Sequence, residues 1–228
     1  MRLSIIIPTL NESDAISEAL ESLQALRSHG HEVIVADGGS CDDTVALSRG
    51  CTDRTINTAK GRALQMNAGA QVAQGGVLVF LHADTRLPAA AEDLIKAAVV
   101  RERRRWGFFK VKLSGAHAML RLIAVLMNLR SALTGIATGD QTLFVCRDVF
   151  ESIGGFPQIP LMEDIAMTRR LKRRARPAVI REYVLTSSRY WEQHGILRSV
   201  LRMWTLRLAY LAGVDPSTLV KQYYGDQM

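Results

Sequence analysis

The chain has 228 residues, 48% of them hydrophobic, which is enough to build one α/β domain with a substantial core. Its formal net charge of +7 indicates nucleic acid, an anionic membrane surface or phosphate-bearing substrates as possible partners. No run approaches the roughly 20 uninterrupted apolar residues of a membrane-spanning helix. The opening MRLSIIIPTL does not resemble a cleavable signal. The three cysteines include no CxxC pair and so favour neither disulfides nor a zinc site. A cytoplasmic protein is therefore expected.

The first part of the sequence alternates predicted strands and helices. Residues 3–7 form a short β-branched run, typical of a strand buried on both faces, and Pro8 ends it. Apolar residues then recur at helical spacing until Gly30. Further strands are predicted at 32–36, 52–56 and 77–81, and helices near 42–48 and at 62–73. This alternation predicts a parallel sheet with right-handed crossovers.

The second part is less regular. Helices are predicted at 89–104, 119–133 and 165–174, and strands at 107–113, 143–146 and 179–185. No linker rich in glycine, serine or proline separates the two parts, and no internal repeat is present. We therefore expect one structural unit.

Carboxylates stand at the ends of several predicted elements. Asp37 and Asp84 each follow a predicted strand, at the sheet edge where ligands of parallel sheets bind. Asp37 could accept hydrogen bonds from a base or ribose, or cap the next helix. Asp84, with diphosphate oxygens, would hold Mg²⁺ or Mn²⁺. Glu163 and Asp164 begin a predicted helix, where the dipole favours their charge, although an ordinary acidic first turn gives the same pattern.

Four segments in order, IIIPTLNE, VADGGSCDDT, FLHADT and GGFPQIPLMED, resemble the motif set of family 2 glycosyltransferases over roughly residues 1 to 195. Two segments, KGRALQMNAGA and GDQTLFVCRDVFESIGGFPQIPLMEDIAMTRRL, are similar to the radical-SAM/selenodomain-associated branch. The resemblance implies the GT-A fold, with a mostly parallel central sheet flanked by helices. It implies one domain over 1–228, divided into a nucleotide-binding half (1–86), an acceptor-side half (87–195) and a C-terminal helical tail (196–228).

The resemblance also implies a nucleotide-diphospho-sugar donor, most commonly a UDP-sugar, and a divalent cation, Mg²⁺ or Mn²⁺. Asp84 matches the last acid of the family's metal-binding DxD motif, and His82 stands where the first Asp of that motif usually stands. His82 is a second candidate ligand, or a packing residue. The residues implied to line the nucleotide pocket are Pro8, Thr9, Leu10, Glu12, Asp37, Gly61, Arg62 and Ala83.

The family's ED pair matches Glu163 and Asp164. Asp164 would be the general base, because an inverting transfer needs a carboxylate that takes the acceptor proton on the sugar face opposite the diphosphate. Glu163 would support it. Candidates for the acceptor or phosphate side are Asp140, Gln141, Arg189, Trp191 and His194. Asp140 is equally typical of a turn, Arg189 and Trp191 depart from the family's QxxRW wording, and His194 also fits an exposed loop.

Residues 196–212 form an amphipathic pattern with an apolar stripe and several arginines. The stripe fits packing on the core. It also fits, as does the 119–133 helix, a peripheral contact with the inner face of an anionic membrane that would bring the site to a lipid-linked acceptor.

Three rival functions follow from other features. A nucleotide-sugar-binding protein that has lost catalysis would share the fold, but would not need the acceptor-side acids. An oxidoreductase is disfavoured because no GxGxxG follows the first strand. Nucleic acid is not expected as a partner, because the arginines are scattered and accompany no recognised motif.

Overall fold

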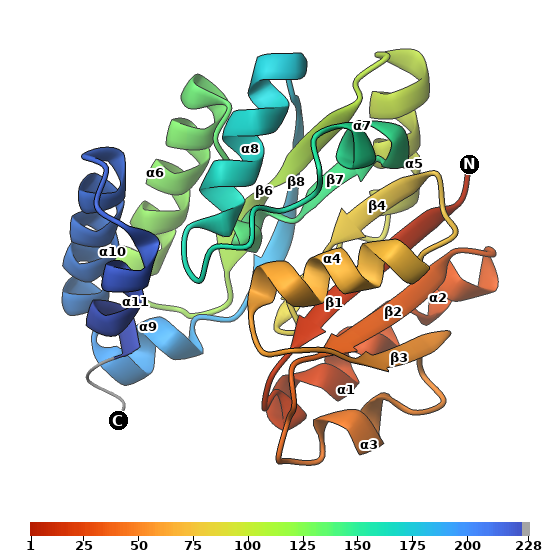
Figure 1. The fold of residues 1–228 in the computed structure, drawn as a ribbon, viewed down its shortest axis with the longest axis horizontal. Helices are drawn as coiled ribbons and strands as arrows, with labels where there is room; N and C mark the ends of the chain where they lie inside the picture. Colours follow the sequence, from red (N-terminus) through yellow and green to blue (C-terminus); the bar gives the residue numbers. More distant parts are fainter. Residues whose placement is uncertain (225–228) are drawn as a thin grey trace.

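The computed structural model describes residues 1–224, and its centre is an eight-stranded sheet with helices on both faces (Figure 1). The strands lie in the order β3-β2-β1-β4-β7-β6-β8-β5. The end of the predicted tail, 225–228, lies outside the described residues. The strands are β1 (Leu3–Thr9), β2 (Glu32–Asp37), β3 (Arg54–Asn57), β4 (Val77–Phe80), β5 (Thr85–Arg86), β6 (Trp106–Leu113), β7 (Leu143–Cys146) and β8 (Ala178–Thr186).

The predicted helices are present with two differences in their bounds, and three further helices, Arg147–Ser152, Arg189–His194 and Pro216–Tyr224, were not predicted. The first predicted helix is interrupted at Leu23, and the helix predicted at 89–104 begins at Ala91 and finishes in a π-helical turn, Ala97–Arg101. The helices are α1 (Ser13–Ser22), α2 (Gln24–Ser28), α3 (Thr44–Ser48), α4 (Arg62–Val72), α5 (Ala91–Lys96), α6 (Ala118–Thr134), α7 (Arg147–Ser152), α8 (Glu163–Arg174), α9 (Arg189–His194), α10 (Ile196–Leu211) and α11 (Pro216–Tyr224).

The sheet is mixed, so the prediction of a mostly parallel sheet is wrong. Strands β1 to β4 pair in parallel, as the alternating pattern predicts. Strand β7, however, lies antiparallel between β4 and β6, and β5 lies antiparallel to β8. Leu143, the first residue of β7, is opposite Phe80, the last of β4. The chain therefore enters β7 at the edge where β4 ends, and β7 runs in the opposite direction to β4. The four apolar residues of β7 give no sequence signal for this direction.

Both faces of the sheet are buried by helices. Successive side chains of a strand point to opposite faces, so Ile5 and Ile7 of β1 pack toward α1 and α5, whereas Ile6 packs toward α4. The second face is also covered by α7 and α8, which contribute Phe150 and Met167. This double burial explains why β1 reads as a continuous apolar run and not as an alternating one.

Helix α6 is tied to the sheet by one polar side chain. The amide of Asn128 accepts a hydrogen bond from the Val111 N–H (2.8 Å) and donates one to the Val111 carbonyl (2.9 Å). These bonds lie just after the register shift between Phe109 and Lys110 in the pairing of β6 with β8. A side-chain amide thus satisfies backbone groups next to the shift. Within residues 1–224, no helix is long and apolar enough to cross a membrane.

Gly69 sets how closely α4 approaches β1. A Cβ at this position would lie 2.4 Å from Cγ2 of Ile6, a fully buried side chain of a central strand. Alanine favours helix by about 1 kcal/mol over glycine, but overpacking a rigid core costs about 1–3 kcal/mol. We expect Gly69→Ala to lower the free energy of unfolding by about 1–2 kcal/mol in urea titrations. Gly76→Ala, where a Cβ meets nothing within 4 Å, is the control; equal stability of both variants would refute tight packing of α4.

Candidate active site

The carboxyl ends of β1 and β2 carry the first part of the site. Asp37, the last residue of β2, is buried, and its carboxylate accepts hydrogen bonds from Thr9 Oγ1 (3.1 Å), Gly39 N (2.9 Å), Ser40 N (2.8 Å) and Ser40 Oγ (2.5 Å). Burial opposes ionisation, but these hydrogen bonds, led by those from Ser40, lower the pKa of Asp37 below its ordinary value. The carboxylate therefore organises the loop after β2, and a contact with a base stays a prediction.

A buried glutamine, missed by the sequence reasoning, holds the same two strand ends together. Gln65 of α4 donates through Nε2 to the carbonyls of Thr9 (2.6 Å) and Ala36 (2.9 Å). Its amide lies so close to Gly38 that a Cβ there would be 3.0 Å from Nε2. The available signal was a polar residue at an inward position of a helix, which must find partners when buried.

The loop after β1 is cross-linked to the loop after β2. Asn11, at a positive φ of 55°, donates from its N–H to Ser40 Oγ (2.8 Å) and accepts from Cys41 N (2.9 Å). Glu12 donates from its N–H to Thr44 Oγ1 (2.8 Å). The segment that contains Pro8, Thr9, Leu10 and Glu12 is thereby fixed beside Asp37, as expected for one pocket wall.

Glu12 connects this wall with the end of β4. Burial and the negative charge of nearby Asp84 raise the pKa of Glu12, while Arg189, His82 and Arg62 oppose that increase. Glu12 Oε2 lies 3.5 Å from Arg189 Nη2, although the two residues are 177 positions apart. The fold thus gathers residues from β1, β4 and α9 at one sheet edge.

One carboxylate of this group, Asp140, comes from the turn before β7. Asp140 lies in a short 3₁₀ turn, Gly139–Gln141, and its Oδ1 is 3.3 Å from His82 Nδ1. Burial opposes ionisation of Asp140, but the hydrogen bond and charge of His82 lower its pKa. A Cβ at Gly139 would lie 2.3 Å from His82 Nε2, so only glycine allows this approach.

Asp164 stands at the start of α8, directly beside that turn. Its Oδ2 accepts from Gly139 N (2.9 Å) and its Oδ1 from Ile165 N (2.6 Å). Burial first, and the adjacent charge of Glu163 second, raise the pKa of Asp164 to about 6. The side chain is still partly exposed. A half-buried carboxyl with a pKa near neutrality is suited to general-base chemistry.

Glu163 is the buried partner of Asp164. Its Oε1 lies 3.5 Å from Nη1 of Arg62, the first residue of α4. Gly61 precedes it with a φ of 142°, a backbone conformation that favours glycine. The predicted pair Gly61 and Arg62 is therefore brought to the predicted pair Glu163 and Asp164, across more than 100 residues of chain.

A second arginine facing these acids was not predicted. Arg130 of α6 is half-buried; burial lowers its pKa, and the charges of Asp164 and Asp140 offset part of that shift. Its Nε is buried and has no hydrogen-bond partner among the described residues. The available sequence signal was weak: an arginine in the mostly apolar 119–133 run, which also contains Arg121 and Asn128.

The remaining candidates contact the protein interior. Gln141 is buried; it accepts from Ser131 Oγ (2.6 Å) and donates to the Phe109 carbonyl (3.4 Å). Trp191 packs on the start of α6, and the His194 ring stacks on Tyr190 with centroids 4.5 Å apart. Roles for these three residues in acceptor binding stay predictions, because their contacts have structural explanations.

The donor set for a divalent cation is small. Among residues 1–224, no three His, Cys, Asp or Glu side chains come together as a metal-binding cluster. Asp84, beside buried Ala83, accepts one long bond from Thr85 Oγ1 (3.3 Å), whereas both ring nitrogens of His82 face Asp140 and Gly139. One carboxylate fits a Mg²⁺ or Mn²⁺ ion that takes its other ligands from phosphates and water. Ligation by His82 stays a prediction.

The raised pKa of Asp164 has a consequence for stability. The folded chain binds this proton more tightly than the unfolded chain, so the free energy of unfolding falls as pH rises from about 4 to about 6. Above about pH 6 the carboxylate is ionised in both states, and the whole destabilisation is present. We expect Asp164→Asn to be more stabilising at pH 8 than at pH 4, by about 1–3 kcal/mol in chemical denaturation. Asp93→Asn, on the exposed surface of α5, controls for loss of a carboxylate. A pH-independent difference would contradict the burial argument.

Comparison with known proteins shows which family this chain resembles. Residues 4–110 match the sequence model of the family described as "Glycosyl transferase family 2". An uncharacterized glycosyltransferase of Mycobacterium tuberculosis (strain ATCC 25618 / H37Rv) is 32% identical over 165 residues, covering 67% of this chain and 62% of the relative. A PGL/p-HBAD biosynthesis glycosyltransferase of Mycobacterium bovis (strain BCG / Pasteur 1173P2) is 35% identical over 91 residues, 37% of this chain and 36% of that protein. This chain thus spans less than two thirds of the length of these relatives.

Solved structures share the fold at low sequence identity. TarS of S. aureus in complex with UDP-GlcNAc superimposes with a TM-score of 0.67 and 19% identity, covering 82% of this chain and 58% of TarS. The mannosyltransferase PcManGT of Pyrobaculum calidifontis, in complex with GDP-Man and Mn²⁺, superimposes with a TM-score of 0.60 and 22% identity. The match covers 80% of this chain and 56% of PcManGT. The α/β fold is therefore that of GT-A glycosyltransferases with a mixed sheet, and the resemblance to family 2 is confirmed.

Proposed function

We propose that this chain, a relative of the family 2 glycosyltransferases, transfers a sugar from a nucleotide-diphosphate donor to an acceptor hydroxyl with inversion. The observation that carries the proposal is the environment of Asp164, a partly exposed carboxyl with a pKa of about 6 at the edge that also holds Asp37 and Asp84. A protein that only binds nucleotides has no use for a base tuned to neutral pH. The acids at the start of α8 therefore favour catalysis.

The donor is proposed to lie along the carboxyl ends of β1, β2 and β4. The polar loops after β1 and β2 form the nucleotide side, and Arg62 and Arg189 bring positive charge toward the diphosphate. Structural relatives were solved with UDP-GlcNAc, with UDP and with GDP-Man, and a UDP-sugar is our first choice. A divalent cation held at Asp84 would neutralise charge that develops on the departing diphosphate.

The transfer is proposed to be a single displacement. The acceptor oxygen bonds to the anomeric carbon while the bond from that carbon to the diphosphate oxygen breaks, and its electron pair leaves with the diphosphate. The acceptor proton passes to the Asp164 carboxylate. The Gly139 N–H fixes one oxygen of that carboxylate at 2.9 Å, so the base is held in place before the acceptor arrives. Glu163, paired with Arg62, keeps the start of α8 oriented.

The acceptor is proposed to enter from the side of Asp140, α6 and α8. Arg130 faces Asp140 and Asp164 from α6 and suits an acceptor that carries an anionic group. A lipid-linked hydroxyl compound at the inner face of a membrane satisfies this arrangement. The similarity to the selenodomain-associated branch does not specify the acceptor beyond its hydroxyl and its anionic group.

Calorimetric titration with UDP and with GDP, each with and without Mn²⁺, tests the donor site. We expect UDP to bind more tightly with Mn²⁺ than without it, and Asp84→Ala to remove that difference, because Asp84 is the carboxylate placed for the cation. Asp93→Ala is the matched control, since this acid is exposed on α5 away from the site. If neither nucleotide binds under any condition, the proposed function is wrong.

The pH dependence of transfer tests the base. Asp164 must be ionised to accept a proton, so kcat/KM should fall as pH drops through about 6. Glu163→Gln removes a neighbouring negative charge and leaves Arg62 and Arg130 facing Asp164, so it should move this limb to lower pH. Asp164→Asn should reduce kcat by about 10²–10⁴-fold with UDP affinity unchanged. An acid limb that Glu163→Gln does not move would place the base elsewhere.

A further inference from the structure

Two helices carry apolar stripes that face solvent. The large hydrophobic side chains that are exposed in residues 1–224 number fifteen, and ten of them lie on α6 and α10. Their spacing of three and four residues puts each set on one helix face, opposite the buried one. They are Leu122, Val125, Leu126, Leu129 and Leu133 on α6 and Leu197, Leu201, Trp204, Leu208 and Leu211 on α10.

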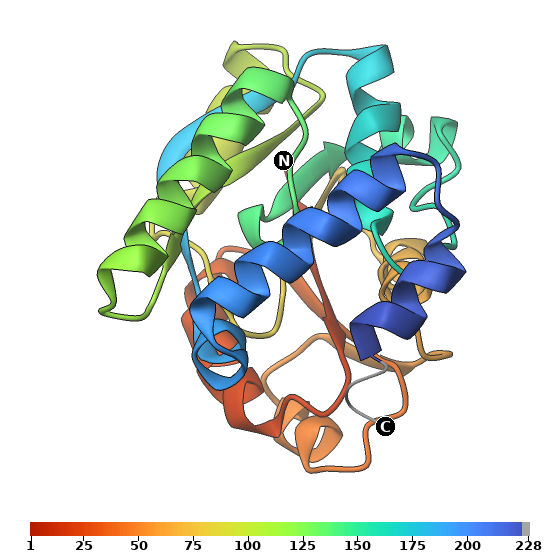
Figure 2. The same ribbon diagram turned by 90° about the vertical axis from the view of Figure 1, so that its left-hand side faces the viewer.

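The two helices belong to one surface. Ile196 and Val200, at the start of α10, pack in the same cluster as Leu120 and Ile123, near the start of α6. Both helices lie along the same side of the molecule, the side that faces the viewer in Figure 2. An uncovered apolar area of this extent marks an interaction site in soluble proteins. We call this area, the two stripes together, the docking face.

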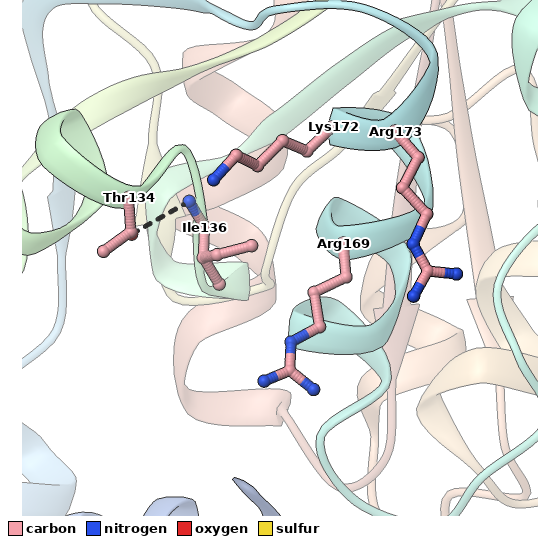
Figure 3. A pocket seen from close by; sticks show the side chains of 5 residues that line it. All are labelled: Thr134, Ile136, Arg169, Lys172 and Arg173. Carbon is pink, nitrogen blue, oxygen red and sulfur yellow. Dashed lines mark hydrogen bonds between the residues drawn. The ribbon is translucent and has the colours of Figure 1, made fainter.

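A basic pocket adjoins the docking face. An open cavity of about 420 Å³ lies between the end of α6 and the outer face of α8. Three cations, Arg169, Lys172 and Arg173, line it opposite Thr134 and Ile136 (Figure 3). The Arg169 guanidinium also lies 5.6 Å from the Tyr210 ring near the end of α10, so the pocket lies beside the last turns of both helices of the docking face.

The charge of this surface selects its partner. Neither α6 nor α10 contains an aspartate or glutamate, while together they contain four arginines besides Arg130, which faces Asp140 and Asp164, and the last two turns of α8 add five further basic residues. In a symmetric dimer through this face, these positive charges would oppose one another. An anionic bilayer offers both missing components, an acyl layer for the stripes and phosphates for the pocket.

We propose that α6 and α10 insert their apolar stripes into the surface of an anionic phospholipid bilayer while Arg169, Lys172 and Arg173 hold a lipid phosphate. Docking itself needs no nucleotide. Asp164 is the second residue of α8, and the helix reaches the pocket at Arg169, five residues later and about 8 Å along its axis. Docking would therefore bring a lipid-linked acceptor to the base, and this last step rests on the proposed function.

Vesicle binding tests the docking face directly. We expect the full chain to sediment with phosphatidylglycerol vesicles at low salt and not with phosphatidylcholine vesicles. Trp204 is 59% exposed, so its emission should shift to shorter wavelength on binding, and Trp204→Phe should remove that shift. Leu129→Gln with Leu201→Gln should weaken binding about tenfold or more, and Lys172→Gln with Arg173→Gln about 30-fold. All four side chains are exposed, so the fold should be retained.

Matched controls come from the opposite end of the sheet. Leu47→Gln on α3, and Arg49→Gln with Arg54→Gln, change exposed residues of the same types and should leave vesicle binding unchanged. Sedimentation velocity without lipid should show a monomer. A dimer that Leu129→Gln with Leu201→Gln dissociates, or equal binding to both vesicle types, would overturn the proposal. Because no nucleotide is present, these outcomes are independent of the UDP titration.

Discussion

The antiparallel insertion of β7 beside β4 is the constraint on which the site depends. Because Leu143 lies opposite Phe80, the turn that precedes β7 must lie at the edge where β4 ends. That turn brings Gly139 against His82 and lets its N–H bind Asp164. A parallel β7 would begin at the other edge, and Asp164 would lose the Gly139 N–H as a hydrogen-bond donor. The strand that departs from the expected sheet thus brings His82, Asp140 and Asp164 together.

Three acidic side chains lie at the same edge, where their negative charges repel one another. Asp140, Glu163 and Asp164 are close together, yet the pKa of Asp140 is lowered whereas that of Asp164 is raised. Arg62 lies 3.5 Å from Glu163, His82 lies 3.3 Å from Asp140, and no ion pair is formed by Asp164 among the described residues. His82 thus favours the anion of Asp140, whereas burial and the charge of Glu163 favour the protonated form of Asp164. The difference separates carboxylates that position from one that can exchange a proton.

The sequence predicted most elements of residues 1–86 well, because the information that specifies them is local. Parallel strands buried on both faces are continuous apolar runs, and an acid directly after such a run must lie at the ligand edge, which located Asp37 and Asp84. The direction of β7 and the partners of Gln65 and Arg130 depend on which distant elements become neighbours. Neither composition nor periodicity encodes that. Glu163 and Asp164 were located by their motif, but the pKa of Asp164 follows from burial that only the assembled fold supplies.

Helix α8 joins the two functions that this structure supports. Its first residues are the acids at the sheet edge, its inner face packs on the sheet through Met167 and Leu171, and its last turns are basic. Acids at the N-terminus and bases at the C-terminus both complement the helix dipole, so this arrangement stabilises the helix itself. The same polarity places Asp164, the proposed base, at the sheet edge and the cations at the outer surface. A rigid helix of 12 residues therefore fixes the distance between the base and any surface that binds the cations, without a moving part.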